Sequence, residues 1–201
     1  MKPKHGRGAD MTRATLIDGA RQAFLELGVN GASLDQVAAR AGVTRGAIYW
    51  HFGNKAELFF ALVEESRAKL LARLQASAGH DDPLERLCQQ WQELLHILQD
   101  DRVLREVLEI VLFRCEYVGP FAAMEERLLE LRTACVAAIA QCYAAAQERR
   151  TLRPGLEPQN LARDTCHCLA SLLRAWLRQP GAGAMAESLA ALDGHLALRR
   201  I

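Results

Sequence analysis

Residues 33–55 constrain this chain more than any other segment, because helix start and stop signals follow one another closely there. Ser33 and Gln36 form the Ser-x-x-Gln capping box of a helix start. Gly42 suits the left-handed backbone of a tight turn, and Thr44 can cap a second short helix. The segment therefore predicts two short helices joined by a tight turn, the arrangement of a helix-turn-helix.

The second helix of this pair exposes side chains that suit contacts with DNA. Arg45 lies in its first turn and can pair bidentately with guanine in the major groove. Thr44 and Tyr49 carry hydroxyls for phosphate or base contacts. His51 can donate to a phosphate, and Lys55 opens the next helix, where the dipole favours a phosphate oxygen. The alternative is an ordinary helical hairpin with solvated polar residues, but the caps, the turn glycine and these side chains together favour DNA binding.

The stretch from about Thr12 to Leu74 resembles the N-terminal domain of the TetR family, and it is most similar to the AcrR-like branch, which represses multidrug efflux pumps. The resemblance is carried by Gly42-Val-Thr-Arg-Gly-Ala-Ile-Tyr-Trp-His-Phe-Gly-Asn-Lys-Ala-Glu-Leu58, and further by Leu108-Glu-Ile-Val-Leu-Phe-Arg-Cys-Glu-Tyr117 and Ala175-Trp-Leu177. It implies a DNA-binding domain over residues 1–54 and a ligand-binding and dimerisation domain over residues 55–201. The implied DNA-binding residues are Ser33, Thr44, Arg45, Gly46, Tyr49, Trp50, His51 and Lys55.

Helical periodicity covers most of the remaining chain, which predicts an all-α fold of about nine helices. Besides the pair described above, the expected helices span 12–27, 54–77, a segment ending near 98, 103–113, 120–149, 158–178 and 186–198. Helix 158–178 is apolar over more than half of its circumference, so it must be covered on two sides. We expect the chain to form a twofold homodimer through a four-helix interface made by its last two helices. The two DNA-binding domains, called the heads below, would then lie on the half-sites of a near-palindromic operator.

The part of the chain after residue 55 combines aromatic and aliphatic side chains with a few polar ones, a composition suited to lipophilic ligands. The resemblance implies a cavity among the middle helices, lined by Trp91, Leu95, Leu108, Leu112, Cys115, Leu172 and Trp176. Ordinary core packing is the alternative for each of these residues. We expect a lipophilic inducer to pivot helix 54–77 and spread the heads, which releases the operator. Repression follows from the resemblance alone, because a helix-turn-helix is equally able to activate.

The net positive charge of this chain is small, but basic residues are in excess at its N-terminal end. The net charge of +1 does not by itself indicate a nucleic-acid binder, but residues 1–55 carry eight Lys/Arg against four Asp/Glu. This excess attracts phosphate to one end. Residues 1–10 have no apolar run after their basic residues, which argues against a signal peptide and fits a flexible basic arm or a short solvated tail. We expect no membrane-spanning stretch and a cytoplasmic location.

The cysteines and the motif content argue against metal, redox and enzyme functions. Reduced, buried thiols are expected for all six cysteines. Cys166, His167 and Cys168 cannot converge on one metal ion, because neighbours along a helix do not share a face. The sequence contains no Gly-rich phosphate loop, no His-Glu-x-x-His motif and no nucleophile elbow. We therefore expect no cofactor, no metal and no catalytic residue.

Two alternatives to a multidrug-responsive regulator remain at this point. Within the same class, the chain could sense a single metabolite or lipid and control a catabolic operon. From a different class, it could be a small helical enzyme or a ligand carrier.

Overall fold

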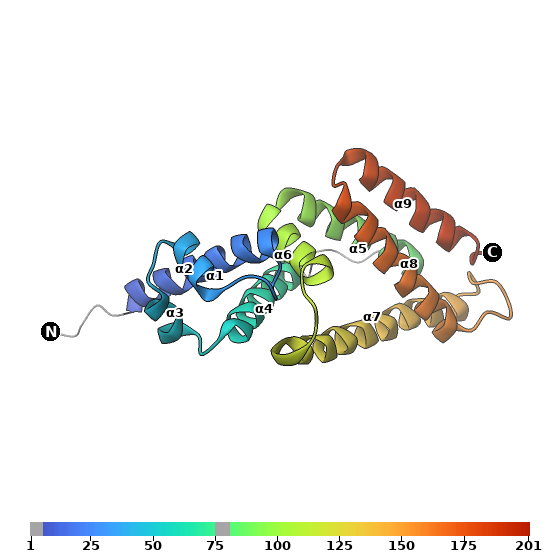
Figure 1. Cartoon of the computed structure of the whole chain (residues 1–201). Helices are drawn as coiled ribbons and strands as arrows, with labels where there is room; N and C mark the ends of the chain where they lie inside the picture. The colour runs from blue at the N-terminus through green and yellow to red at the C-terminus, as the bar shows by residue number, and fades with distance from the viewer. Residues whose placement is uncertain (1–5, 75–80) are drawn as a thin grey trace. The chain divides into compact units, whose positions relative to one another are not determined.

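The computed structural model describes residues 6–74 and 81–201, and of residues 6–11 it describes the backbone alone. Within these ranges the chain forms nine α-helices, one 3₁₀ turn and one isolated β-bridge, which confirms the all-α prediction (Figure 1). The helices are α1 (Gly6–Leu27), α2 (Leu34–Ala41), α3 (Arg45–His51), α4 (Lys55–Leu74), α5 (Pro83–Asp100), α6 (Arg102–Phe113), α7 (Ala122–Glu148), α8 (Pro158–Arg178) and α9 (Ala182–Ala197), with the 3₁₀ turn η1 (Gly119–Phe121) before α7.

The chain separates into two compact units. Unit 1 contains the described residues up to Leu70 together with Arg102–Met124, and unit 2 contains Leu71–Asp101 and Glu125–Ile201. Unit 1 is therefore larger than the predicted DNA-binding segment 1–54, since it also includes most of α4 and all of α6. The functional boundary at residue 54 stays a prediction.

The core of unit 1 is built around aromatic side chains from three separate segments. The Phe59 ring of α4 lies between those of Phe24 and Phe121, with edge-to-face contacts at centroid distances of 6.0 and 5.8 Å. Helix α1 can approach α2 closely because it has Gly19 at the crossing, where an added Cβ would lie 2.9 Å from the Cβ of Ala41. This close approach fixes α2 against the longest helix of the unit.

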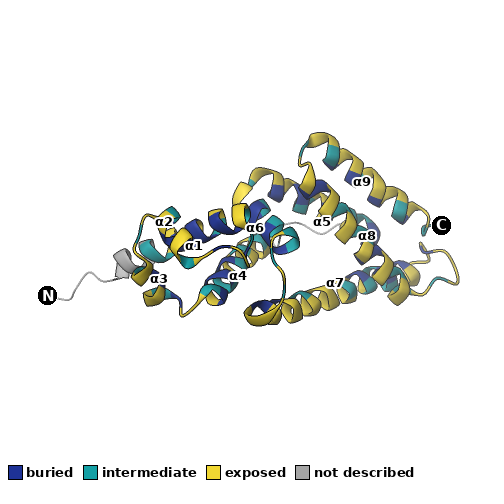
Figure 2. Cartoon of the chain, viewed as in Figure 1, coloured by how far each residue is buried: buried dark blue, intermediate teal, exposed yellow. Residues whose placement is uncertain are grey.

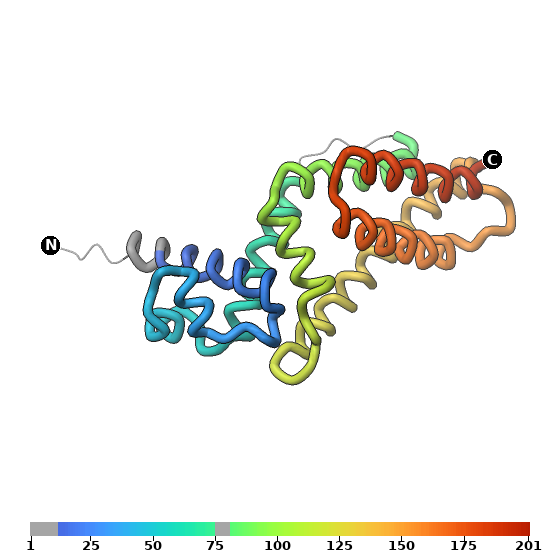
Figure 3. Tube along the Cα trace, turned by 45° about the horizontal axis from the view of Figure 1, so that its top comes forward, coloured from blue at the N-terminus to red at the C-terminus, as the bar shows by residue number. Residues whose placement is uncertain are grey.

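Unit 2 has one buried and one partly buried polar contact that tie α9 to its neighbours. The indole Nε1 of Trp91 donates to Ser188 Oγ at 3.1 Å, which joins α5 to α9. Thr165 Oγ1 of α8 lies 2.7 Å from the Tyr143 hydroxyl of α7 and 2.9 Å from His195 Nε2 of α9. Helices α8 and α9 lie side by side (Figure 3).

Several helix ends differ from the prediction. Helix α1 begins at Gly6 instead of Thr12, so residues 6–10 are helical and do not belong to an arm; residues 1–5 lie outside the described residues. Helix α9 begins at Ala182 instead of Ala186, since Gly181 is its N-cap and its carbonyl accepts from the Met185 N–H at 2.9 Å, which closes the first turn. The predicted end of helix 54–77 also lies outside the described residues, since α4 is described to Leu74.

The expectation that no stretch could span a membrane needs correction. By length and composition, the segment Gly119–Glu148 is long and apolar enough, and 11% of its apolar window is buried. Most of α7 is indeed coloured as exposed in Figure 2. The sequence did not make this segment obvious because Glu130, Arg132 and Gln141 interrupt its apolar residues, so no continuous apolar run is present. Length and composition alone do not establish a span, because helices of soluble proteins pass the same test.

Candidate nucleic-acid interface

Caps and a glycine turn define the start and end of α2, as the sequence predicted. Ser33 Oγ accepts from the Gln36 N–H at 3.2 Å, and Gln36 Oε1 accepts from the Ser33 N–H at 2.8 Å, so the capping box is complete. Gly42 adopts a φ of 66°, and the Val43 N–H after it donates to the Ala38 carbonyl at 3.0 Å. The two short helices and the turn between them are confirmed.

Helix α3 is held by its apolar face and not by a side-chain cap. Ile48 and Phe52 are buried, and Ala47 is half-buried. Thr44 occupies the N-cap position with an extended backbone, which confirms the predicted start of this helix, although its hydroxyl makes no capping hydrogen bond. A helix of seven residues is too short to be stable alone, and tertiary packing supplies its stability.

The opposite face of α3 is exposed and carries three of the large side chains that the sequence singled out. Arg45 and Tyr49 are about half exposed, and the Trp50 side chain is 79% exposed. A tryptophan this open to solvent is unusual in a folded domain, because burying its large apolar surface is favourable. The exposed face therefore suits contact with a partner outside the unit.

Arg45 is oriented by two neighbours. Its Nη1 donates to Asp35 Oδ2 at 3.0 Å, and its Nη2 donates to the Tyr49 hydroxyl at 3.0 Å. The guanidinium also lies over the Tyr49 ring, 5.6 Å from its centroid. The hydrogen bond to Tyr49 and the charge of Asp35 raise the pKa of Arg45, which stays fully charged. Sequence reasoning singled out Arg45 and Tyr49 but missed Asp35.

Gly46 is exposed beside Arg45, and the fold does not explain the absence of a side chain there. An added Cβ would meet only Thr44 Oγ1, at 3.8 Å, which is ordinary contact. Its φ also lies outside the positive range that favours glycine. A glycine that neither packing nor backbone conformation requires leaves room for close approach by an external partner.

Three other predicted DNA contacts, Ser33, His51 and Lys55, already have partners within the protein. The Ser33 hydroxyl is engaged in the capping box. His51 is half-buried, and its ring lies edge-to-face against Trp50 at 5.5 Å. Lys55 is also half-buried, and burial lowers its pKa.

Lys55 makes internal contacts that the sequence did not predict. Its Nζ donates to the carbonyls of Asn30 and Ala32 at 2.8 and 2.7 Å, and it lies 5.7 Å from the centroid of the Phe121 ring. The carbonyls belong to the loop between α1 and α2, so Lys55 holds that loop against the start of α4. A phosphate contact by the same ammonium stays a prediction, and it must now compete with these bonds.

The same loop is also tied to the segment after α6. The Asn30 side chain bonds twice to the backbone of Glu116: its Oδ1 accepts from the N–H at 2.8 Å, and its Nδ2 donates to the carbonyl at 3.1 Å. The Val29 N–H donates to the Arg114 carbonyl at 2.7 Å. The sequence contained no signal for these contacts, which join residues more than 80 positions apart.

The seven residues predicted to line a ligand cavity fall in both units. Trp91, Leu95, Leu172 and Trp176 belong to unit 2, and Leu108, Leu112 and Cys115 belong to unit 1. Trp91 serves as a core residue through its bond to Ser188. Trp176 is 1% exposed, and its Nε1 has no hydrogen-bond partner among the described residues. A buried indole N–H without an acceptor is costly unless something else satisfies it.

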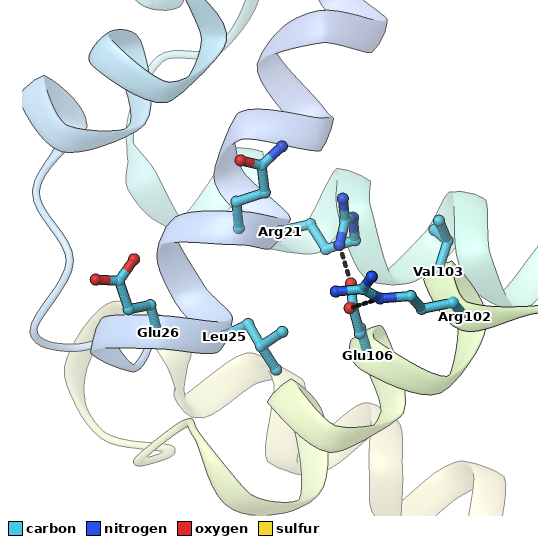
Figure 4. A pocket seen from close by; sticks show the side chains of 7 residues that line it. Arg21, Leu25, Glu26, Arg102, Val103 and Glu106 are labelled. Atoms are coloured by element: carbon cyan, nitrogen blue, oxygen red, sulfur yellow. Dashed lines mark hydrogen bonds and ion pairs between the residues drawn. The ribbon is translucent and has the colours of Figure 1, made fainter.

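A cavity of about 500 Å³ lies between α1 and α6 of unit 1, and none of the seven predicted residues lines it. Figure 4 shows its charged wall, where Glu106 pairs with Arg21 on one side and with Arg102 on the other. Glu106 is only 6% exposed, and Arg102 Nε donates to its Oε1 at 2.6 Å. Arg21 also donates to Asp18 Oδ1 at 2.6 Å. This ion-pair network fastens α6 to α1, and sequence reasoning missed it.

The cysteines are free, but most are less buried than predicted. Cys166 is buried, Cys135 is exposed, and the other four are half-buried. Partial burial raises the pKa of Cys88 and Cys115 to about 11, which keeps these thiols protonated near neutral pH. Among the residues that the structure describes, no group of three or more His, Cys, Asp or Glu side chains is placed to hold a metal ion.

Comparison with known proteins places this architecture in a family. Residues 16–62 match the family described as bacterial regulatory proteins, tetR family. The chain is 34% identical over 168 residues to the HTH-type transcriptional repressor BepR of Brucella suis, an alignment that spans 83% of this chain and 80% of BepR.

Two solved structures are similar over nearly the whole chain. NalD, the secondary repressor of the MexAB-OprM multidrug efflux pump in Pseudomonas aeruginosa, matches with a TM-score of 0.79 at 30% identity, covering 96% of this chain and 98% of NalD. SmeT in complex with triclosan matches with a TM-score of 0.77 at 28% identity, covering 95% of this chain and 92% of SmeT. Together with its exposed helix-turn-helix, these likenesses show that the chain belongs to the TetR family and is a DNA-binding transcriptional regulator, not an enzyme.

Proposed function

We propose that this protein is a cytoplasmic repressor that binds operator DNA as a homodimer, controls a multidrug efflux system and is released by lipophilic compounds. The observation that carries the proposal is the exposed face of α3, on which Arg45, Tyr49 and Trp50 project from a helix anchored by buried Ile48. The efflux target and the repressor role are supported by the likeness to BepR and NalD.

On operator DNA, α3 enters the major groove. Arg45 reads a base edge, while Thr44 and Tyr49 contact phosphates through their hydroxyls. Gly46 lets the backbone approach the DNA, and Trp50 supplies apolar contact. Ser33, His51 and Lys55 complete the predicted set at its edge, where their internal partners limit them to weaker phosphate contacts.

Dimerisation through α8 and α9 would present two copies of α3 to two half-sites. On α8, Leu169, Leu172 and Leu173 are only half-buried in the single chain, and on α9 Leu189 is half-buried. A second copy of the same two helices would cover this apolar surface in an isologous four-helix contact.

The inducer is expected to combine apolar surface with a hydrogen-bond acceptor. Trp176 supports this description, because its buried N–H has no acceptor among the described residues. The complex of SmeT with triclosan supports a lipophilic ligand. We infer that such a ligand favours an arrangement of α4 in which the two heads no longer match the operator spacing. A single-metabolite sensor of a catabolic operon is the second candidate.

The test is fluorescence anisotropy of the DNA upstream of the protein's own gene, at one fixed salt concentration, with and without triclosan and other lipophilic drugs. Specific binding that several unrelated drugs reverse supports the proposal. Specific binding that no drug reverses leaves the DNA role and favours the single-metabolite sensor. The Arg45→Ala variant is the control, since it should lose more affinity for this DNA than for a random duplex of equal length.

A further inference from the structure

The contact between Asp35 and Arg45 joins the two helices of the helix-turn-helix on their exposed side. Arg45 is the first residue of α3, and Asp35 is the second residue of α2. Their side chains are 55% and 64% exposed, and the ion pair measures 3.0 Å. A pair this exposed contributes little to folding, because water solvates both charges nearly as well.

The geometry of the pair matters more than its energy. Asp35 accepts a hydrogen bond from Nη1 of Arg45, and the Tyr49 hydroxyl accepts one from Nη2. The guanidinium is thereby held at both terminal nitrogens and against the Tyr49 ring, while its remaining N–H groups stay available for a base. A long arginine side chain loses rotamer freedom when it docks, and a side chain already held in one orientation loses less.

The negative charge of Asp35 has a second consequence. A carboxylate beside the reading arginine repels phosphates, so it weakens binding to DNA of any sequence. The carboxylate also disfavours binding modes in which Arg45 bonds to a DNA phosphate instead of a base. An element that penalises the wrong partner increases discrimination without adding affinity.

We propose that Asp35 is a specificity-determining residue that positions Arg45 for base reading. It acts through Arg45 and need not touch the operator itself. The proposal rests on the proposed DNA-binding function, and Tyr49 is the second support of the same guanidinium. A helix-dipole role for Asp35 in the first turn of α2 would not depend on Arg45, so the two roles can be separated.

The experiment begins with in vitro selection of binding sites from a randomised duplex pool, using the full-length wild-type protein. Dissociation constants are then measured at one salt concentration for the selected site, for each of its single-base-pair variants and for a random duplex. The variants are Asp35→Asn, Tyr49→Phe and Arg45→Ala, with the double variant Asp35→Asn/Arg45→Ala. Glu26→Gln is the matched control, because Glu26 is 65% exposed and pairs with Arg40 of α2, which lies outside the reading helix.

We expect Asp35→Asn to lower discrimination at one base pair of each half-site about three- to tenfold. Tyr49→Phe should lower discrimination at the same base pair by a smaller factor. Glu26→Gln should change the affinity for all duplexes by one common factor, since it alters charge alone. In the Arg45→Ala background, Asp35→Asn should have no further effect on discrimination.

The inference is overturned if Asp35→Asn changes the affinity for every duplex by the same factor, as Glu26→Gln does. It is also overturned if Asp35→Asn still lowers discrimination when Arg45 has already been replaced by alanine. If the wild-type protein selects no sequence at all, the proposed function fails and this inference fails with it.

Discussion

Two of the arginine–carboxylate pairs that join helices of unit 1 differ clearly in how much water surrounds them. Arg21 of α1 pairs with Glu106 of α6, and both side chains are largely buried. Arg45 of α3 pairs with Asp35 of α2, and both are more than half exposed. The buried pair holds the fold because its charges have no solvent to replace a lost partner. The exposed pair can be lost without unfolding the protein, so it can serve recognition.

The largest effect is expected from breaking the buried pair. Glu106→Gln removes the charge that faces Arg21 and Arg102, and it should lower the free energy of unfolding by about 3 kcal/mol. Chemical denaturation of the full chain measures it. The matched variant Asp35→Asn removes a carboxylate from the exposed pair and should cost less than about 1 kcal/mol. Equal losses would contradict the distinction between the two pairs.

Arg45→Ala should act on recognition instead of stability. We expect it to weaken operator binding by about 1–3 kcal/mol and to relax specificity at one base pair. Its free energy of unfolding should change by less than about 0.5 kcal/mol, because the side chain is exposed. Arg40→Ala is the control, since Arg40 lies on α2 and pairs with Glu26. A uniform loss of affinity for every DNA sequence would show that Arg45 contacts phosphates.

Lys55 tests whether one residue can contribute both to the stability of the fold and to DNA binding. Lys55→Met keeps the apolar stem near Phe121 but leaves the carbonyls of Asn30 and Ala32 without their donor, which should cost about 1–2 kcal/mol of stability. If the ammonium also reaches a phosphate, the dependence of log affinity on log salt should fall by about one unit in slope. Unchanged stability together with a lower slope would mean that the internal bonds contribute nothing.

Gly46→Ala should move stability and DNA binding in opposite directions. Alanine is a better helix former than glycine and would make only an ordinary contact with Thr44 Oγ1 here, so stability should rise by up to about 1 kcal/mol. Operator affinity should fall, because the new methyl group would lie between the backbone of α3 and the DNA and keep them apart. Gly183→Ala in α9 meets open space and, provided that the variant still dimerises, should leave the operator affinity unchanged. Tighter operator binding by Gly46→Ala would argue against a close approach of the α3 backbone to the DNA at this position.

The smallest effect is expected from pH, at a polar contact of intermediate burial. Burial lowers the pKa of His195, with a further contribution from Arg199 that outweighs its opposing neighbour Asp164. A depressed histidine pKa means that the unfolded chain binds the proton more tightly, so stability should fall as the pH drops below about 6.5. His195→Gln should flatten this dependence in thermal unfolding measured between pH 7.5 and 5.5. An unchanged slope would assign the dependence to other groups.

Short-range signals predicted the helix-turn-helix well. The capping box of Ser33 and the turn at Gly42 depend on residues three to five positions apart, so the chain itself contains the whole signal. The inward direction of Ile48 and the outward direction of Tyr49 follow from the helical period in the same way. The family resemblance rested on the same residues, which is why the family and the all-α class could be identified before the structure.

Tertiary structure alone decided the contacts between distant segments. Glu106 looks like an ordinary helix-surface acid in the sequence, yet it is buried against Arg21, 85 positions away. Lys55 looked free for DNA, but the loop between α1 and α2 brings two carbonyls to its ammonium. Asp35 had no visible role until the turn placed it beside Arg45. Local signals determine which way a helix faces and, in the helix-turn-helix, where each helix begins. The partner of a charged group depends instead on the packing of helices far apart in the chain.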